Sequence, residues 1–208
     1  MNGDWPEIED LGRVAFDDVH RRMLTLADSI RSGRSKGKIL FVEHDPVFTA
    51  GRATPKGELA ADVVSIERGG RITYHGPGQL VVYPIVALPR RDVRAWLRAL
   101  EDFGVAICER FGVAAEPSVD GTGVFVAGRK VASIGVAIRH WINLHGISIN
   151  AAMDLTPFQR IRPCGLDPDI MSDLRTAVGR DLTLEDVKQA AREALPALFA
   201  FGEAHGGG

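Results

Sequence analysis

Apolar residues recur at every third or fourth position in three stretches of the chain, residues 17–33, 91–112 and 183–195. This spacing matches the period of an α-helix and predicts a helix with one buried face in each stretch. Asp92 is a candidate N-cap of the second helix. Thr183 and Asp186 have the spacing of a capping box at the start of the third.

The predicted helices also carry signals at their ends. Gly33 and Gly112 follow the first two stretches, where a glycine commonly stops a helix. Pro196 follows the third stretch, and its missing amide predicts that this helix ends or kinks there.

Short apolar runs without the helical period predict strands at residues 38–44, 62–67 and 79–88. The last of these runs is apolar almost throughout, as in a central strand or one covered on both faces. Residues 123–150 predict three more strands, with turns at Ala127–Gly128 and within 139–143. Consecutive strands joined by such short turns pair antiparallel.

The predicted helices are few and grouped, and they do not alternate with the strands. This order indicates an α+β fold, a mostly antiparallel sheet flanked by a few helices, and not a doubly wound α/β fold. A length of 208 residues fits one domain spanning residues 1–208. We expect the tail, residues 203–208, to be disordered.

Composition narrows the class of protein. The chain is 45% hydrophobic and 25% charged with a net charge of −2, so no overall field favours nucleic acid or an anionic membrane. The acidic N-terminus has no apolar core of a signal peptide, and no apolar run is long enough for a membrane span. We therefore expect a cytoplasmic protein with reduced thiols.

A glycine-rich segment, RGGRITYHGPGQLVVYP, occupies residues 68–84. It has no Lys-Ser/Thr after its glycines, a strand follows it, and Pro77 removes an amide, so a phosphate cradle is disfavoured. Two interpretations stay open. Gly69 and Gly70 let a ligand approach bare backbone and form the wall of a slot, or the segment is a bent strand with a tight turn.

The two cysteines, Cys108 and Cys164, have different surroundings. Cys108 lies among apolar residues of a predicted helix, as buried structural cysteines do. Cys164 lies between Pro163 and Gly165, outside any regular element, which makes it a candidate nucleophile. A free thiol has a pKa of about 8.5, so such a nucleophile needs an activating partner.

Two residues are candidates for that partner. His75 lies in the glycine-rich segment, and histidine is a common base beside a nucleophilic thiol. Lys130 lies inside an otherwise apolar strand, and a desolvated lysine can exchange protons near neutrality. Such a lysine can also lie at the rim of a sheet and extend its amine to water, and spacing alone does not decide between these positions.

Five segments of the chain resemble, in order, the signature blocks of lipoyl(octanoyl) transferases, the octanoyl-[acyl-carrier-protein]:protein N-octanoyltransferases of lipoate biosynthesis. The segments are EHDPVFTAGR, ERGGRITYHGPGQLVVYPI, GRKVASIGVAI, HGISIN and DLTPFQRIRPCGL. They run from Glu43 to Leu166. The chain departs from the family at Ser148, where alanine or another small residue is usual, which alters the pocket slightly.

The resemblance implies a biotin/lipoate-protein ligase-like fold and a Cys/Lys dyad. Cys164 is the implied nucleophile that carries the acyl thioester. Lys130 is the implied acid and base, and as an ammonium it would also lower the pKa of the Cys164 thiol. The implied substrate-binding residues are Arg68, Gly69, Gly70, Arg71, Ile72, Thr73, Tyr74, His75, Ser133, Ile134, Gly135, Gly146, Ile147 and Ser148.

The resemblance also implies the reaction and its partners. The octanoyl group arrives on the phosphopantetheine of acyl carrier protein and passes through Cys164 to a lysine of a lipoyl domain. The implied acceptors are lipoyl domains of 2-oxoacid dehydrogenase E2 subunits and the H protein of the glycine-cleavage system. No ATP, other cofactor or metal is expected, and neither is a nucleic-acid or membrane partner. We expect a monomer.

Three other functions compete with this one: an ATP-dependent lipoate or biotin ligase on the same fold, an acyl-thioesterase, and a non-catalytic binding module. Acyl carrier protein is acidic, so it should dock on a basic patch. The candidate patch consists of Arg90, Arg91, Arg94, Arg98 and Arg162. The first four are equally consistent with the solvated face of a helix.

Overall fold

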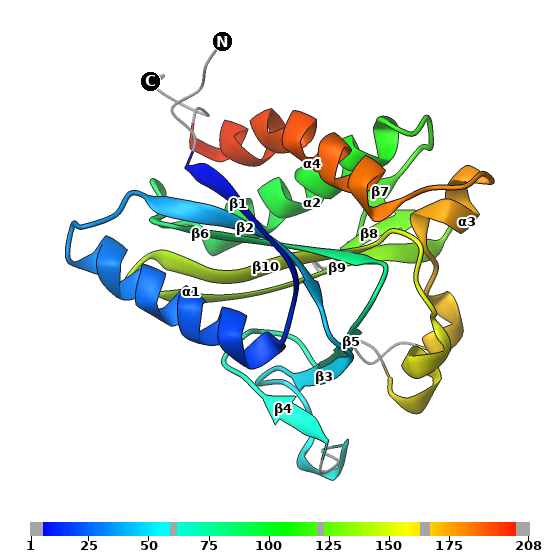
Figure 1. The fold of residues 1–208 in the computed structure, drawn as a ribbon, viewed down its shortest axis with the longest axis horizontal. Helices are drawn as coiled ribbons and strands as arrows, with labels where there is room; N and C mark the ends of the chain where they lie inside the picture. The colour runs from blue at the N-terminus through cyan, green and yellow to red at the C-terminus, as the bar shows by residue number, and fades with distance from the viewer. Residues whose placement is uncertain (1–5, 59–61, 120–122, 163–166, 203–208) are drawn as a thin grey trace.

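A mixed seven-stranded sheet forms the centre of the protein in a computed structural model, which describes residues 6–58, 62–119, 123–162 and 167–202 (Figure 1). Its strands lie in the order β1-β2-β6-β10-β9-β8-β7. Their bounds are β1 Glu7–Val14, β2 Gly37–His44, β6 Gln79–Val86, β7 Glu116–Pro117, β8 Gly123–Val126, β9 Arg129–Arg139 and β10 Ile142–Asn150. A second sheet has the order β4-β3-β5 and contains β3 Val47–Ala50, β4 Val63–Ser65 and β5 Ile72–His75.

Helices cover both faces of the large sheet (Figure 1). Helix α1 (Phe16–Arg31) packs on β2, β6 and β10, whereas α2 (Val93–Glu109) and α4 (Leu184–Phe199) pack together on the opposite face. A short α3 (Leu174–Val178) precedes α4. The 3₁₀ turns are η1 Lys56–Glu58, η2 Thr156–Arg160, η4 Pro168–Ile170 and η5 Ala200–Gly202. The predicted α+β class and the mostly antiparallel sheet are confirmed, with parallel pairing between β1 and β2 and between β3 and β4.

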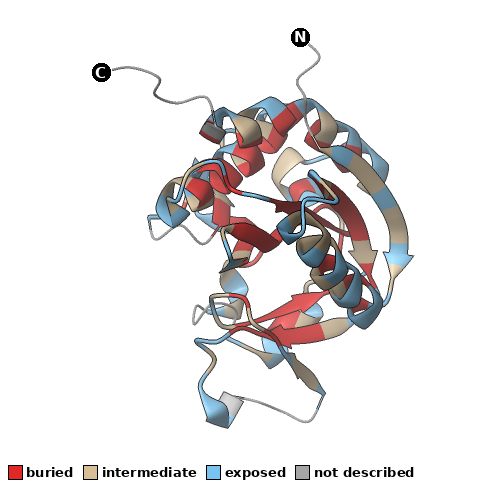
Figure 2. Cartoon of the chain, turned by 90° about the vertical axis from the view of Figure 1, so that its left-hand side faces the viewer, coloured by how far each residue is buried: buried red, intermediate tan, exposed pale blue. Residues whose placement is uncertain are grey.

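Strand β6 is the centre of the core. All eight of its residues are buried, because β2 and β10 flank it and helices cover both of its faces (Figure 2). On the side of α2 and α4, Trp96, Leu100 and Phe103 pack against the sheet in the larger apolar cluster. On the side of α1, Val19 and Met23 belong to a second cluster. The continuous apolar run of this strand is the sequence signal of burial on both faces.

The predicted helix signals are mostly confirmed. Asp92 accepts a hydrogen bond from the amide of Ala95, and Thr183 with Asp186 forms the capping box. Pro196 does not end the helix, because α4 continues to Phe199; the alternative of a kink at Pro196 stays a prediction. Leu198 in this last turn is fully buried against the core, and its burial outweighs the hydrogen bond that proline removes.

Two tight turns join β8, β9 and β10. Ala127 and Gly128 have φ of 49° and 74°, and His140 and Trp141 have φ of 52° and 60°. Positive φ at both central residues is the geometry of type I′ hairpin turns. The second turn is therefore shorter than the predicted range 139–143.

Strand β1 has no counterpart in the prediction because its side chains are mostly polar. It lies at the edge of the sheet beside β2, and Lys38 of β2 forms ion pairs with Glu7 and Glu9. Lys188 of α4 pairs with Asp10 at 2.8 Å. Hydrogen bonds to β2 and these ion pairs hold β1 in the sheet, so the strand does not need a run of buried apolar side chains. Among the described residues, no helix is long and apolar enough to cross a membrane.

Candidate active site

A cavity of about 570 Å³ opens on the α1 side of the large sheet. Its walls come from the segment before β5, the middle of β9 and β10, and the chain around β7. Eleven of the fourteen predicted substrate-binding residues line it: Arg68, Gly70, Arg71, Thr73, His75, Ser133, Ile134, Gly135, Gly146, Ile147 and Ser148. Segments that are far apart in the sequence thus meet at one hollow. Their role in binding a substrate stays a prediction.

The other three predicted residues, Gly69, Ile72 and Tyr74, do not line this cavity. The amide of Gly69 donates to the carbonyl of Val136 at 2.8 Å, which fastens the loop to β9. Ile72 lines a neighbouring hollow formed by η2 and Pro168. Tyr74 packs in a small apolar cluster with Phe48 and Phe158.

Arg68 is a buried residue that organises the glycine loop. Its Nη1 donates to the carbonyls of Gly69 and Arg71, at 3.0 and 2.7 Å. Its Nη2 donates to the carbonyl and the hydroxyl of Thr49, at 2.7 and 2.9 Å. The guanidinium therefore ties the loop to β3. This interaction positions the cavity wall, whatever ligand the cavity takes.

Glycines are required where this loop meets its neighbours. A Cβ at Gly135 would lie 2.9 Å from Cδ of Arg68. A Cβ at Gly51 would lie 2.4 Å from the carbonyl oxygen of Gly70. Gly51 belongs to the segment EHDPVFTAGR, and its role was not predicted from the sequence. The loop and the sheet can approach this closely only because both positions lack a side chain.

The GPG triplet forms the tight turn between β5 and β6. Gly78 has a φ of 82°, and its amide donates to Glu43 Oε1 at 2.8 Å. A Cβ there would lie 2.2 Å from the carbonyl oxygen of Ala152. The segment thus combines the two interpretations that its sequence left open. Residues before and within β5 line a cavity, and the GPG glycines make a turn.

His75 is buried and belongs to a chain of hydrogen bonds. Its Nδ1 lies 2.7 Å from Oε1 of Gln79, whose Nε2 donates to Oδ1 of Asn150 at 2.9 Å. Asn150 in turn donates to the carbonyl of Ser172 at 2.8 Å. Burial and, to a smaller extent, the neighbouring His44 lower the pKa of His75 to about 3. The imidazole is therefore neutral at physiological pH.

Lys130 is fully buried on β9, so the alternative of a rim lysine that extends to water is wrong. Its Nζ lies 5.7 Å from the ring centroid of Phe125, a residue that lines the cavity. A Cβ at Gly123 would lie 2.6 Å from the lysine's Cε and 2.2 Å from the carbonyl oxygen of Ala132. Gly123, which the sequence analysis did not single out, thus makes room for the lysine.

Cys164 lies outside the described residues. The chain that follows this segment approaches Lys130, since Met171 bridges to Lys130 and the amide of Ser172 donates to the Lys130 carbonyl at 2.9 Å. Ile170 lines the cavity. Cys108 is buried in α2, as predicted, and burial raises the pKa of its thiol to about 12. That thiol is therefore not a nucleophile at neutral pH.

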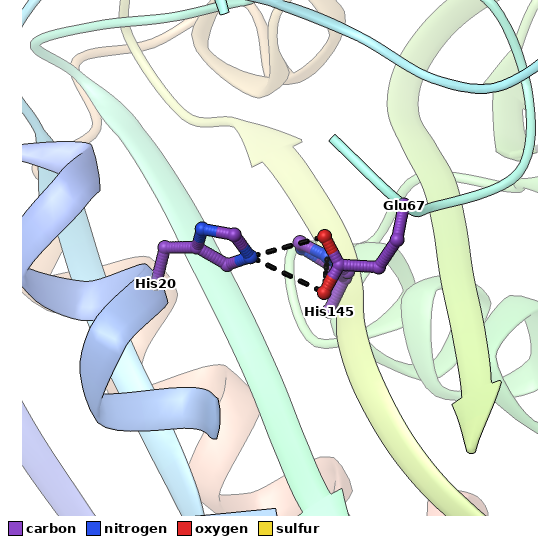
Figure 3. Close-up of side chains that lie close together, drawn as sticks. All are labelled: His20, Glu67 and His145. Atoms are coloured by element: carbon purple, nitrogen blue, oxygen red, sulfur yellow. Dashed lines mark hydrogen bonds and ion pairs between the residues drawn. The ribbon is translucent and has the colours of Figure 1, made fainter. Parts of the chain in front are cut away.

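A cluster of His20, Glu67 and His145, which the sequence analysis did not single out, lies beside the cavity (Figure 3). Nε2 of His20 lies 3.0 and 3.2 Å from the two Glu67 carboxylate oxygens, and Nε2 of His145 lies 3.5 Å from Oε1. The two histidines lower the pKa of Glu67 far below its usual range, whereas burial lowers the pKa of His145. The three residues come from distant segments of the chain, so no local sequence motif predicts the cluster.

The predicted basic patch divides into two parts. Arg90, Arg91, Arg94 and Arg98 lie at or near the start of α2, which covers the face of the sheet opposite to α1 and the cavity (Figure 1). Arg98 pairs with the buried Glu101 at 3.0 Å. Arg162 instead lies beside η2, where it lines the hollow next to Ile72. These five arginines therefore do not form one surface.

Residues 20–196 match the family model of the lipoyl protein ligase A/B catalytic domain. A protein named Octanoyltransferase, from Geobacter metallireducens, is 38% identical over 197 residues, which cover 92% of this chain and 92% of that protein. The chain belongs to the octanoyltransferase family. As an octanoyltransferase family member, it carries the five blocks singled out in the sequence, and four of them lie wholly within the described residues.

Two solved structures show that this octanoyltransferase family member shares its fold with ligases. Lipoate-protein ligase A bound with ATP superimposes with a TM-score of 0.72 and 16% identity, covering 94% of this chain and 85% of that one. Biotin protein ligase from Aquifex aeolicus, in complex with biotin and ATP, superimposes with a TM-score of 0.60 and 14% identity. The match covers 95% of this chain and 72% of that one. The predicted biotin/lipoate-protein ligase-like fold is confirmed. At these identities the likeness concerns the fold alone.

Proposed function

We propose that this protein transfers an octanoyl group from acyl carrier protein to the lysine of a lipoyl domain, through a thioester on Cys164. The observation that carries the proposal is the fully buried Lys130. Its strand is hydrogen-bonded to the chain that follows Cys164, and it lies beside a largely apolar cavity. A volume of about 570 Å³ lies within the usual range of small-molecule sites.

The first step is a thioester exchange. The Cys164 thiolate attacks the carbonyl carbon of the octanoyl thioester, and the bond to the phosphopantetheine sulfur breaks. The departing thiolate takes a proton, which the Lys130 ammonium can supply. One thioester replaces another of nearly equal free energy, so the step needs no ATP.

The second step forms an amide. The neutral amine of the acceptor lysine attacks the Cys164 thioester, and the bond between carbon and sulfur breaks. Lys130, now neutral, takes the proton from the attacking nitrogen, and Cys164 leaves as the thiolate. The products are an octanoyl amide and the free enzyme, with Lys130 protonated as at the start.

His75 shapes the site in this proposal and does not act as the base. Its depressed pKa keeps it neutral, and its hydrogen bond to Gln79 fixes the ring. The tetrahedral oxyanion needs backbone or side-chain donors, each worth about 3 kcal/mol in a preorganised site. Glycine-rich backbone lies along the cavity wall, where such donors can approach a ligand.

A transfer assay separates this function from its rivals. Octanoyl-acyl carrier protein and a lipoyl domain are incubated with the protein, without ATP, and the mass of the lipoyl domain is recorded. We expect an octanoyl adduct on the lipoyl domain. Transfer that needs ATP and free octanoate would instead indicate a ligase. Release of free octanoate faster than transfer would indicate a thioesterase, and no reaction at all would indicate a binding module.

A further inference from the structure

His20, Glu67 and His145 converge on one point from three elements. His20 projects from α1, His145 from β10, and Glu67 from the segment before β5 (Figure 3). The side chain of His20 is 24% exposed, that of Glu67 16% and that of His145 2%. The cluster thus lies at the junction of the helix, the sheet and the glycine loop.

The distances between the three groups fit a tetrahedral metal site. Ligands at about 2.1 Å from a zinc ion in a tetrahedron lie about 3.4 Å from one another. Here Oε1 of Glu67 lies 3.2 Å from Nε2 of His20 and 3.5 Å from Nε2 of His145. The chosen ligand atoms of all three residues lie within 4.8 Å of one another.

The surroundings of His145 also indicate a missing ligand. Its Nε2 is buried, and among the described residues it has no partner at normal hydrogen-bond geometry, since Oε1 of Glu67 lies 3.5 Å away. A buried, unsatisfied imidazole nitrogen costs free energy unless something binds it.

The charges near the cluster also permit a cation. Glu67 supplies a carboxylate, and each histidine supplies an imidazole nitrogen. Arg68 is a nearby positive charge, but its guanidinium is turned to oxygens of Thr49, Gly69 and Arg71. Two imidazoles and a carboxylate are a ligand set that zinc accepts with a fourth position open.

We propose that His20, Glu67 and His145 form a binding site for one divalent zinc ion, with the fourth ligand position toward the cavity. His145 and Phe16, beside His20, both line the cavity, so a water or an anionic ligand can reach that position. No metal was expected from the sequence; His20, Glu67 and His145 lie in separate segments of the chain. This proposal is independent of the acyl-transfer reaction.

Cobalt provides a direct test, because Co²⁺ replaces zinc and its visible absorption reports coordination geometry. The metal-free protein is titrated with Co²⁺ in the Cys164→Ser background, so that this thiol cannot bind the ion. We expect one Co²⁺ per chain with the strong absorption of a four-coordinate site. Absence of binding, or the weak spectrum of a six-coordinate ion, would overturn the proposal.

Variants locate the site. His20→Gln, Glu67→Gln and His145→Asn should each weaken Co²⁺ binding at least tenfold. His140→Asn changes an exposed histidine of the β9–β10 turn and should leave binding unchanged. Equal affinity in His20→Gln and the parent protein, or an equal loss in His140→Asn, would contradict the assignment. Circular dichroism of each metal-free variant shows that it folds.

Thermal unfolding adds a second readout. Zinc at about a hundredfold excess over its Kd should raise the Tm of the parent protein by roughly 5 °C or more. The Glu67→Gln variant should show a clearly smaller rise at the same zinc concentration, because it lacks the charged ligand. An undiminished rise in this variant would place the zinc elsewhere.

Discussion

The backbone amide of Ser172 donates to the carbonyl of Lys130 at 2.9 Å. This bond, with the bridge between Lys130 and Met171, fixes the chain that follows the Cys164 segment to the strand that carries a fully buried lysine. Asn150, which donates to the carbonyl of Ser172, extends the connection to Gln79 and His75. One hydrogen-bonded framework thus joins three of the five family segments.

Replacing Lys130 should remove the proton transfer and leave the fold intact. Methionine has a similar length and suits a buried site, so we expect Lys130→Met to fold and to lose at least about 100-fold in transfer rate. Lys188→Met is the matched control, since Lys188 is also buried but pairs with Asp10 of β1, at the edge of the sheet away from β9. That variant should keep its rate and lose some stability. Unchanged turnover in Lys130→Met would remove the lysine from the mechanism.

Gly135→Ala should disturb the cavity wall because the new methyl group would press on the Arg68 side chain. We expect a loss of about 1–3 kcal/mol in the free energy of unfolding, measured by urea denaturation. Gly69→Ala serves as the control in the same loop, because its Cβ would lie 3.6 Å from the nearest atom, the carbonyl oxygen of Val136. If both variants are equally stable, then contact with the Arg68 side chain does not explain the glycine at position 135.

Stability should fall as the pH drops below about 6.5. The pKa of His75 is about 3 in the folded protein and near 6.5 when unfolded, so the unfolded state binds more protons in that interval. His75 alone should cost about 2 kcal/mol at pH 5 relative to pH 7. The pKa values of His44 and His145 are also lowered, which adds to the loss.

The measurement is the free energy of unfolding between pH 7 and pH 5, for the wild type and His75→Gln. The variant should show a shallower dependence by about 2 kcal/mol over that interval. Identical slopes would mean that His75 titrates normally in the folded protein.

Arg162 is the arginine of the predicted patch that we expect to contact acyl carrier protein. It lines the same hollow as Ile72, next to the segment that borders the cavity. Arg94 lies on α2, which covers the opposite face of the large sheet. Arg162→Glu should raise the KM for octanoyl-acyl carrier protein by about three- to tenfold, and more at low salt. Arg94→Glu reverses the same charge and should have little effect. The opposite ranking would place the docking surface on α2.

Much of the fold could be predicted because its signals are local. The apolar run of β6 and the spacing of apolar residues along α1, α2 and α4 indicate which residues are buried. Strand β1 carries no such pattern, since pairing with β2 and ion pairs to Lys38 and Lys188 hold it at the edge of the sheet. Pro196 predicted a possible helix end that the structure does not have. Core packing of Leu198 outweighs the tendency of proline to end a helix.

The parts of the candidate site that are contiguous in the sequence could be predicted. The contacts between residues from distant segments could not. The glycine block and the β9 and β10 blocks were recognised as sequence motifs, and the structure brings them to one cavity. The contacts of Gly51 and Gly123 and the convergence of His20, Glu67 and His145 depend on tertiary packing. No spacing in the chain encodes these relationships.

The most direct test of the account is the intact mass of the protein after incubation with octanoyl-acyl carrier protein and no acceptor. We expect one octanoyl adduct on the wild type and on Cys108→Ser, because Cys108 is buried with a pKa near 12. The adduct should be absent from Cys164→Ala. A Cys164→Ala protein that carries the adduct, or that still octanoylates a lipoyl domain at the normal rate, would contradict the account.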